Sequence, residues 1–242
     1  MGDGMKSLKA LLFGLAIFCS GCASYVTPGG SVNLADINRK DIAEAASRKP
    51  SLNFPARIAI VRVQAPQYKS YTSESYSYGR FSVVTTQELL TDEQVDGMSK
   101  WPSVAGVAPI NRLLLPPNMD SIDDLRVSAA KVQADVLLIY TIDTSFRVQG
   151  RVHAPLSLLS LGMVPDRDAY ITSTASALFT DVRTGFIYGL SEATAKSTGL
   201  TNAWGSSGTV DLKRIEAEQE SFKLLIPQLE KTWVGITRQY VK

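Results

Sequence analysis

The chain has 242 residues, of which 45% are hydrophobic and 20% are charged, a composition typical of folded globular proteins and not of disordered or integral membrane ones. Its 25 lysines and arginines nearly balance its 23 acidic residues, and no basic stripe indicates a nucleic-acid interface. Two cysteines, Cys19 and Cys22, and one histidine, His153, exclude a zinc site built from several cysteine and histidine ligands.

The N-terminal segment has the order of a secretory signal peptide. Lys6 and Lys9 precede an apolar run over residues 10–18, and the small residues Ser20 and Gly21 follow it. The run is about half as long as the roughly 20 apolar residues that a spanning helix needs. We therefore predict a signal peptide over residues 1–21.

Residues 18–22, Phe-Cys-Ser-Gly-Cys, resemble the lipobox of bacterial lipoproteins. The resemblance implies cleavage before Cys22 and lipidation of that cysteine, and several acyl chains make such an anchor effectively permanent. The next residues, Ala23 and Ser24, lack the aspartate of the inner-membrane sorting pattern, which implies an outer-membrane anchor and a domain facing the periplasm. The alternative is an ordinary signal peptide with Cys22 as an unmodified thiol.

Proline, glycine and serine at positions 28–31 predict a flexible tether over residues 22–35, before a single domain over residues 36–242. A short helix capped by Asp36 is expected to end before Pro50, with a weak apolar face that includes Ile42. Residues 57–64, rich in isoleucine and valine, predict an internal strand.

Residues 67–79 predict a loop in which four tyrosines lie among serines and threonines. Tyrosines in such surroundings form adaptable contact surfaces in binding loops. The candidate partner contacts are therefore Tyr68, Tyr71, Tyr76 and Tyr78. The alternative is a solvent-facing connection with two of the tyrosines folded back onto the core.

The middle of the chain predicts alternating strands and helices. A strand over 81–85 precedes a helix capped by Thr86 or Thr91, and residues 104–115 are extended, with Pro109 indicating an edge or bent strand. A capping pattern at Ser121 begins a helix over 122–133, which leads directly into a buried strand over 134–149.

The connection over residues 154–164 is unusually apolar for a segment between two strands. Its candidate contact residues are Leu156, Leu158, Leu159, Leu161 and Met163. The segment could pack on its own sheet, bind another protein or a second copy, or enter the membrane interface. Eleven residues are too few to cross a bilayer as a helix.

Two alternating strands over 172–182 and 186–196, joined by Arg-Thr-Gly, predict a hairpin. A long amphipathic helix then begins near Asp211, and Pro227 is expected to kink or split it. Its buried stripe is predicted to contain Ile215, Phe222, Leu225, Leu229, Trp233, Ile236 and Tyr240. Its solvated face is predicted to carry Lys213, Arg214, Glu216, Glu218, Glu220 and Lys223.

These elements predict an α+β fold: a layered α/β sandwich whose mixed, largely antiparallel sheet packs against helices, including a long C-terminal one. The sequence contains no glycine-rich phosphate loop and no Gly-x-Ser-x-Gly nucleophile motif. We therefore expect no catalytic residues, no cofactor, no metal and no enzymatic activity.

The strands at 57–61 and 81–85, the helix-strand unit ending at 139 and the hairpin strand and turn at 178–185 resemble a group of periplasmic lipoproteins with a core like the N-terminal domain of TolB. The group includes peptidoglycan-synthase activator, curli secretion channel and flagellar accessory lipoproteins. The resemblance implies a non-enzymatic assembly or accessory factor of an envelope complex. Its expected partners are the membrane, through the lipid, and an envelope protein or further copies of the chain. The alternatives are a ring-forming secretion or export component and a periplasmic lipoprotein that binds a small molecule or glycan.

Overall fold

The computed structural model describes residues 30–32, 42–70, 73, 75–76, 78–85, 88–150, 167–201 and 207–241. These residues form a seven-stranded sheet with the strand order β2-β4-β1-β7-β8-β9, in which β5 also pairs with β1. The strands of this sheet are β1 (Ala56–Gln64), β2 (Ser75–Tyr76), β4 (Ser82–Val84), β5 (Val104–Pro109), β7 (Val136–Gly150), β8 (Arg167–Asp181) and β9 (Ile187–Thr201). A separate short pair joins β3 (Tyr78–Gly79) and β6 (Asn118–Met119).

The described helices are α3 (Ile42–Ser47), α4 (Asp92–Ser99), α5 (Ile122–Lys131) and α7 (Ser207–Tyr240), with a 3-10 turn at Arg112–Leu114. Strand β1 runs parallel to β5 and β7, whereas the pairs β1–β4, β7–β8 and β8–β9 are antiparallel. The predicted mixed, largely antiparallel sheet with a long C-terminal helix is therefore confirmed.

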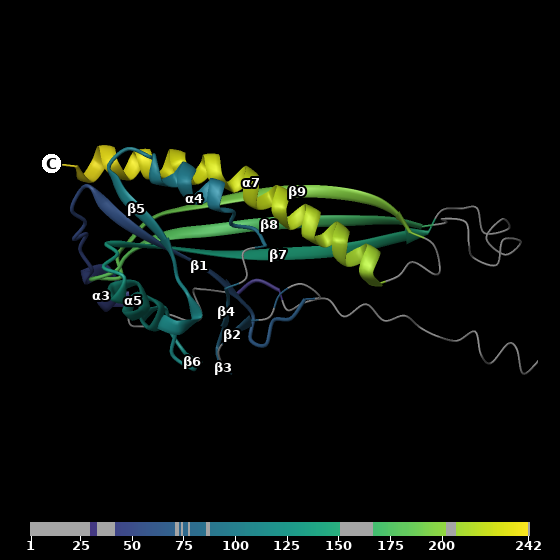
Figure 1. Cartoon of the computed structure of the whole chain (residues 1–242), viewed down its shortest axis with the longest axis horizontal. Coiled ribbons are helices and arrows are strands. Elements are labelled where there is room, and N and C mark those ends of the chain that lie inside the picture. The colour runs from purple at the N-terminus through teal and green to yellow at the C-terminus, as the bar shows by residue number, and fades with distance from the viewer. Residues whose placement is uncertain are drawn as a thin grey trace, which may run out of the picture.

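The sheet separates two hydrophobic cores. On one side, Ile58 and Ile60 of β1 pack with Leu138 of β7, Phe179 of β8 and Trp233 of α7, and α4 contributes to the same cluster. On the other side, alternate residues of the same strands pack against α5, which contributes Ile122, Leu125 and Ala129. Figure 1 shows the result as layers, with α4 and α7 on one side of the sheet and α5 on the other.

Strands β7, β8 and β9 extend well beyond the rest of the sheet. Each of them is 15 residues long, whereas β1 pairs with β7 only from Val136 to Tyr140. In Figure 1 the three long strands project away from α5. The molecule thus has a broad end covered on both faces and a three-stranded end on which α7 is the one described helix that packs.

The helix boundaries follow the predicted capping residues. Thr91 accepts a hydrogen bond from the Gln94 amide, and the Gln94 side chain accepts one from Thr91, so α4 begins at a capping box. At α5, Asp124 accepts a hydrogen bond from the Ser121 amide at 2.9 Å. Among the described strands, the proline-containing β5 pairs with β1 alone, as expected for an edge strand.

One helix prediction is corrected, and of the two outcomes predicted at Pro227 one is excluded. The described part of α3 buries no residue, and Ile42 is 85% exposed, so the predicted apolar face does not pack on the domain. Pro227 does not split the C-terminal helix, because α7 is continuous from Ser207 to Tyr240, although it changes direction along its length in Figure 1. Pro227 and Lys223 are both exposed, so water can satisfy the Lys223 carbonyl that a proline leaves unpaired.

Candidate functional site

The two halves of α7 are held to the sheet by different interactions. The C-terminal half inserts Phe222, Leu225, Leu229 and Trp233 into the core, each with no exposed surface. The N-terminal half instead presents Asp211, Arg214 and Glu218, which are also buried. The contact of the N-terminal half with the sheet is therefore largely ionic.

Glu218 lies at the centre of this ionic cluster, between two arginines. Its carboxylate accepts hydrogen bonds from Arg214 Nη1 at 2.6 Å, Arg62 Nη2 at 3.2 Å and the Thr144 hydroxyl at 3.1 Å. Asp211 accepts a further bond from Arg214 Nε at 2.8 Å. Burial disfavours the charged guanidinium, but the fields of Glu218 and Asp211 outweigh it and raise the pKa of Arg214. Arg214 thus stays charged inside the protein.

The cluster leaves little free space. The cavity beside Gln64, Tyr68, Arg214 and Glu218 measures about 10 Å³, which holds no more than one water molecule. Within the described residues, Arg214 Nη2 and Arg62 Nε have no hydrogen-bond partner. The cluster therefore joins α7 to β1 and β7, and the space beside it is too small for a substrate.

The cluster corrects the prediction of a fully solvated charged face on the C-terminal helix. Arg214 is 1% exposed and Glu218 is 3% exposed. The missed signal is their spacing, because Arg214, Glu218 and Phe222 follow one another at four-residue steps and so continue the buried stripe. Five members of the predicted apolar stripe are buried, namely Phe222, Leu225, Leu229, Trp233 and Ile236, whereas Ile215 and Tyr240 are half-buried.

The same cluster removes Tyr68 from the predicted contact surface. Tyr68 is 1% exposed, and its hydroxyl accepts hydrogen bonds from Arg62 at 3.2 Å and Arg214 at 3.3 Å. The Arg62 guanidinium also lies over the Tyr68 ring, 5.2 Å from its centre. The loop therefore turns this tyrosine back into the domain, because two buried arginines need an acceptor there.

The other predicted contact tyrosines have different positions. Tyr78 is 76% exposed, whereas Tyr76 is half-buried against the α5 core and its ring stacks under Arg112. Tyr71 lies outside the described residues, as do Cys22 and the five predicted contact residues of segment 154–164. The structure therefore brings no two of the predicted site residues into one accessible site within the described ranges.

A second polar centre lies at the β8–β9 turn. Asp181 accepts hydrogen bonds from the Tyr188 hydroxyl at 2.6 Å, from the Ser51 amide at 2.8 Å and from the Thr184 amide at 3.0 Å. Burial alone would raise the pKa of Asp181, but these bonds outweigh it and hold the pKa below its ordinary value. Burial and the neighbouring carboxylate raise the pKa of Tyr188. This centre fastens residues 51–52 to the turn.

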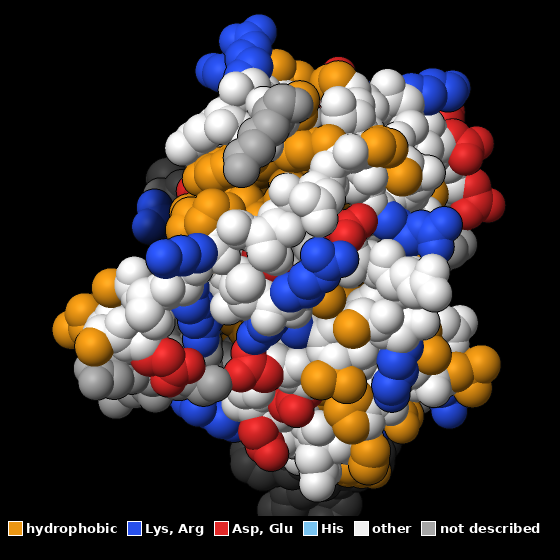
Figure 2. All heavy atoms as spheres, turned by 90° about the vertical axis from the view of Figure 1, so that its left-hand side faces the viewer, with side chains coloured by type: hydrophobic (Ala, Val, Ile, Leu, Met, Phe, Trp, Pro, Cys, Tyr) orange, Lys and Arg blue, Asp and Glu red, His pale blue; other side chains and the backbone are white. Residues whose placement is uncertain are grey.

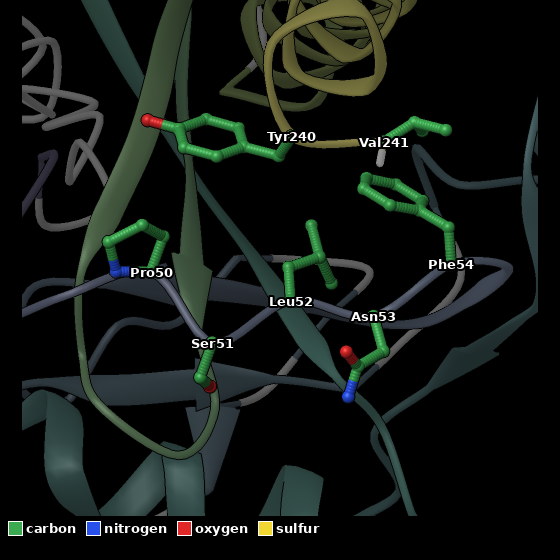
Figure 3. A pocket seen from close by; sticks show the side chains of 7 residues that line it. All are labelled: Pro50, Ser51, Leu52, Asn53, Phe54, Tyr240 and Val241. Carbon is green, nitrogen blue, oxygen red and sulfur yellow. The ribbon is translucent and has the colours of Figure 1, made fainter.

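A pocket of about 490 Å³ opens beside this centre, between residues 50–54 and the C-terminal end of α7. Figure 3 shows Leu52 and Phe54 facing Tyr240 and Val241 across it. Figure 2, which views this end of the molecule, shows patches of hydrophobic side chains interspersed with charged side chains of both signs. None of the described residues that line the pocket has a charged side chain that would select a ligand.

The three-stranded end presents an accessible face opposite α7, here called the open face. Its described side chains are Asp143, Ser145 and Arg147 of β7, Tyr170, Thr172, Thr174 and Ser176 of β8, and Leu190, Glu192, Thr194 and Lys196 of β9. All are exposed or half-buried, and Leu190 is 71% exposed. A groove of about 450 Å³ crosses this face between residues 31–32 and the three strands.

Part of the predicted flexible tether is fastened at this groove. The Gly30 carbonyl accepts a hydrogen bond from the Ala65 amide at 3.1 Å, and the Val32 amide donates to the Thr141 hydroxyl at 3.3 Å. Residues 30–32 are thus part of the fold. Because they bind the sheet beside the open face, this face is the candidate functional site.

None of the described helices is both long and apolar enough to cross a bilayer. Across the described part of the chain, no three aspartate, glutamate, histidine or cysteine side chains gather as a metal site would require.

No protein-family model and no curated protein sequence matches the chain. Among solved structures, lipoprotein GNA1162 from Neisseria meningitidis is 14% identical with a TM-score of 0.33, covering 64% of this chain and 92% of that one. Hypothetical protein CT253 from Chlamydia trachomatis is 11% identical with a TM-score of 0.33, covering 73% and 96%. Protein XCC0632 from Xanthomonas campestris is 11% identical with a TM-score of 0.33, covering 88% and 99%. The resemblance to the TolB-like group stays a prediction, and the proposed function rests on the residues of this chain.

Proposed function

We propose that the protein is a lipid-anchored envelope lipoprotein that supports assembly of a membrane-associated complex without catalysing a reaction. The observation that carries the proposal is the attachment of Gly30 and Val32 to the sheet. Gly30, the first of them, lies eight residues after the lipobox cysteine Cys22. Eight residues span at most roughly 29 Å. The anchor therefore holds the open face close to the membrane.

The character of the open face favours protein contacts. It combines hydroxyl side chains, one exposed leucine and charges of both signs on a rigid three-stranded support. Extended strands with alternating exposed side chains present contacts at fixed spacing, which suits recognition of another folded protein. The buried setting of the ionic cluster favours a structural role for its charged groups over a catalytic one.

The anchor is tested by metabolic labelling with a clickable fatty acid, followed by membrane fractionation. We expect the full-length protein to take up the label and to sediment with the outer membrane, and Cys22→Ser to lose both properties. Cys19→Ser is the matched control, because that residue leaves with the signal peptide and its loss should change neither. A labelled Cys22→Ser variant would contradict the proposal.

The assembly role is tested by photo-cross-linking in intact cells. A photoreactive residue at Arg147 on the open face is expected to capture an envelope protein other than this chain. The matched control places the same group at Glu220, which is exposed on α7. Equal capture from both positions, or capture from neither, would refute the assigned surface.

A further inference from the structure

Strand β9 lies at the edge of the main sheet. It pairs with β8 along its length, from Ile187 to Thr201, and within the described residues no strand pairs with its other side. A long edge strand exposes a row of backbone donors and acceptors that another strand can join, and natural proteins usually protect such an edge with proline or bulges. No proline occurs within β9, and its one irregularity in the pairing with β8 lies near its start, between Ile187 and Gly189.

The sequence of β9 reads nearly the same in both directions about Thr194. Residues 189–199 are Gly-Leu-Ser-Glu-Ala-Thr-Ala-Lys-Ser-Thr-Gly. Glycine, serine and alanine recur at equal distances on both sides of Thr194, and Glu192 and Lys196 take equivalent positions with opposite charge. A strand with this symmetry is complementary to itself when a second copy runs antiparallel to it.

We propose that a second copy of this chain pairs with β9 in antiparallel fashion, about a two-fold axis at Thr194, so that one sheet runs through both copies. In this register Glu192 of each copy lies directly opposite Lys196 of the other. Both side chains are exposed and lie on the open face, so the two ion pairs form on the same surface as the proposed partner site. Directly opposed charges of unlike sign stabilise neighbouring strands.

The same charges disfavour other pairings. Parallel pairing in register would place Glu192 against Glu192 and Lys196 against Lys196, and like charges directly opposite each other are destabilising. A shift of the antiparallel register by two residues would separate both ion pairs. Glu192 and Lys196 therefore favour the antiparallel register centred on Thr194, because they attract in that register and repel or separate in the others.

The face of β9 toward α7 suits the same arrangement. Ser191 contacts α7 through hydrogen bonds to the Thr232 hydroxyl at 2.8 Å and to the Gln228 carbonyl at 3.3 Å. A two-fold axis through the sheet puts both α7 helices on the same side of the joined sheet. On that side Ala193 comes opposite Ala195, and Ser191 opposite Ser197, so small residues line the junction where the two helices approach each other.

The proposal is tested on full-length protein in mild detergent by analytical ultracentrifugation, and it does not depend on lipidation of Cys22. We expect a dimer whose dissociation constant rises about tenfold or more in Glu192→Lys and in Lys196→Glu, because two attractive pairs become repulsive. The double variant, Glu192→Lys with Lys196→Glu, restores both pairs and is expected to return to the wild-type value. Circular dichroism checks that each variant is folded.

Disulfide trapping tests the position of the axis. In the full chain with Cys19→Ser and Cys22→Ser, Thr194→Cys places two thiols next to each other across the axis, at a separation that suits a disulfide. The matched control is Thr174→Cys, one strand further in on the same face. We expect rapid cross-linking only for Thr194→Cys. A monomeric wild-type protein, single charge reversals without effect, or equal trapping of both cysteines would overturn the proposal.

Discussion

Replacing Glu218 by glutamine should remove a large part of the protein's free energy of unfolding. The substitution preserves the volume of the side chain but removes the negative charge between Arg62 and Arg214. The neutral amide keeps one acceptor oxygen, and its NH2 group meets a guanidinium that also only donates. Two buried positive charges are then left with weaker compensation.

The expected loss is about 3 kcal/mol in the free energy of unfolding, because breaking a buried ion pair by removing one partner costs about 3–5 kcal/mol and Asp211 still accepts from Arg214. Domains of this kind are stable by only about 5–15 kcal/mol. With a urea dependence of about 2 kcal/mol per molar, the unfolding midpoint should fall by about 1.5 M.

The assay is urea unfolding followed by far-ultraviolet circular dichroism at neutral pH. Glu216→Gln is the matched control, because Glu216 lies on the same helix and forms an ion pair with Lys213 at 2.6 Å, but its side chain is 56% exposed. An exposed pair of this kind contributes at most about 1 kcal/mol. If both variants shifted the midpoint equally, or if Glu218→Gln left it unchanged, the buried ionic cluster would not hold α7 as described.

Three further substitutions test other parts of the fold. Tyr188→Phe should lower the free energy of unfolding by about 1–2 kcal/mol at pH 7, since it removes a hydrogen bond to Asp181. The lowered pKa of Asp181 stabilises the fold above pH about 4, and this contribution is lost as the pH falls through the folded pKa. The variant should therefore show a weaker acid dependence in unfolding measured from pH 7 to pH 2. Trp233→Ala should lose about 3–5 kcal/mol, because its ring is fully buried, and calorimetry should show a correspondingly lower Tm. Gly185→Ala should lose about 1–2 kcal/mol in urea unfolding, since Gly185 has φ +70° and a Cβ there would lie 2.9 Å from Arg48 Nη1; an unchanged midpoint would show that the turn can relax.

The regular elements could be predicted because their patterns are local. The β-branched run at 57–64 gave strand β1, and the capping residues Thr91 and Ser121 placed the starts of α4 and α5. The alternating strands around Gly185 gave the hairpin of β8 and β9. In each case the deciding residues are neighbours along the chain.

The buried charges could not be predicted in the same way, because their partners come from distant segments. Arg62 on β1 meets Glu218 across 156 positions, and Tyr68 meets Arg214 across 146. A charged residue on an amphipathic helix is normally solvated, so the spacing of Arg214 and Glu218 within the buried stripe was the one local sign of their position. The symmetry of β9 about Thr194 likewise has no effect on the secondary structure of one chain and concerns only pairing between two.

The attachment of Gly30 also determines how the domain would respond to mechanical load. Among the described residues, a pull from the N-terminal side is carried to the sheet by the hydrogen bond between Gly30 and Ala65, just beyond the end of β1, and by the contact between Val32 and Thr141 on β7. Two hydrogen bonds hold less strongly than the 15 residue pairs between β7 and β8, so they would break before those strands separated. The junction would thus act as a weak link that lengthens the connection while the rest of the domain keeps its shape.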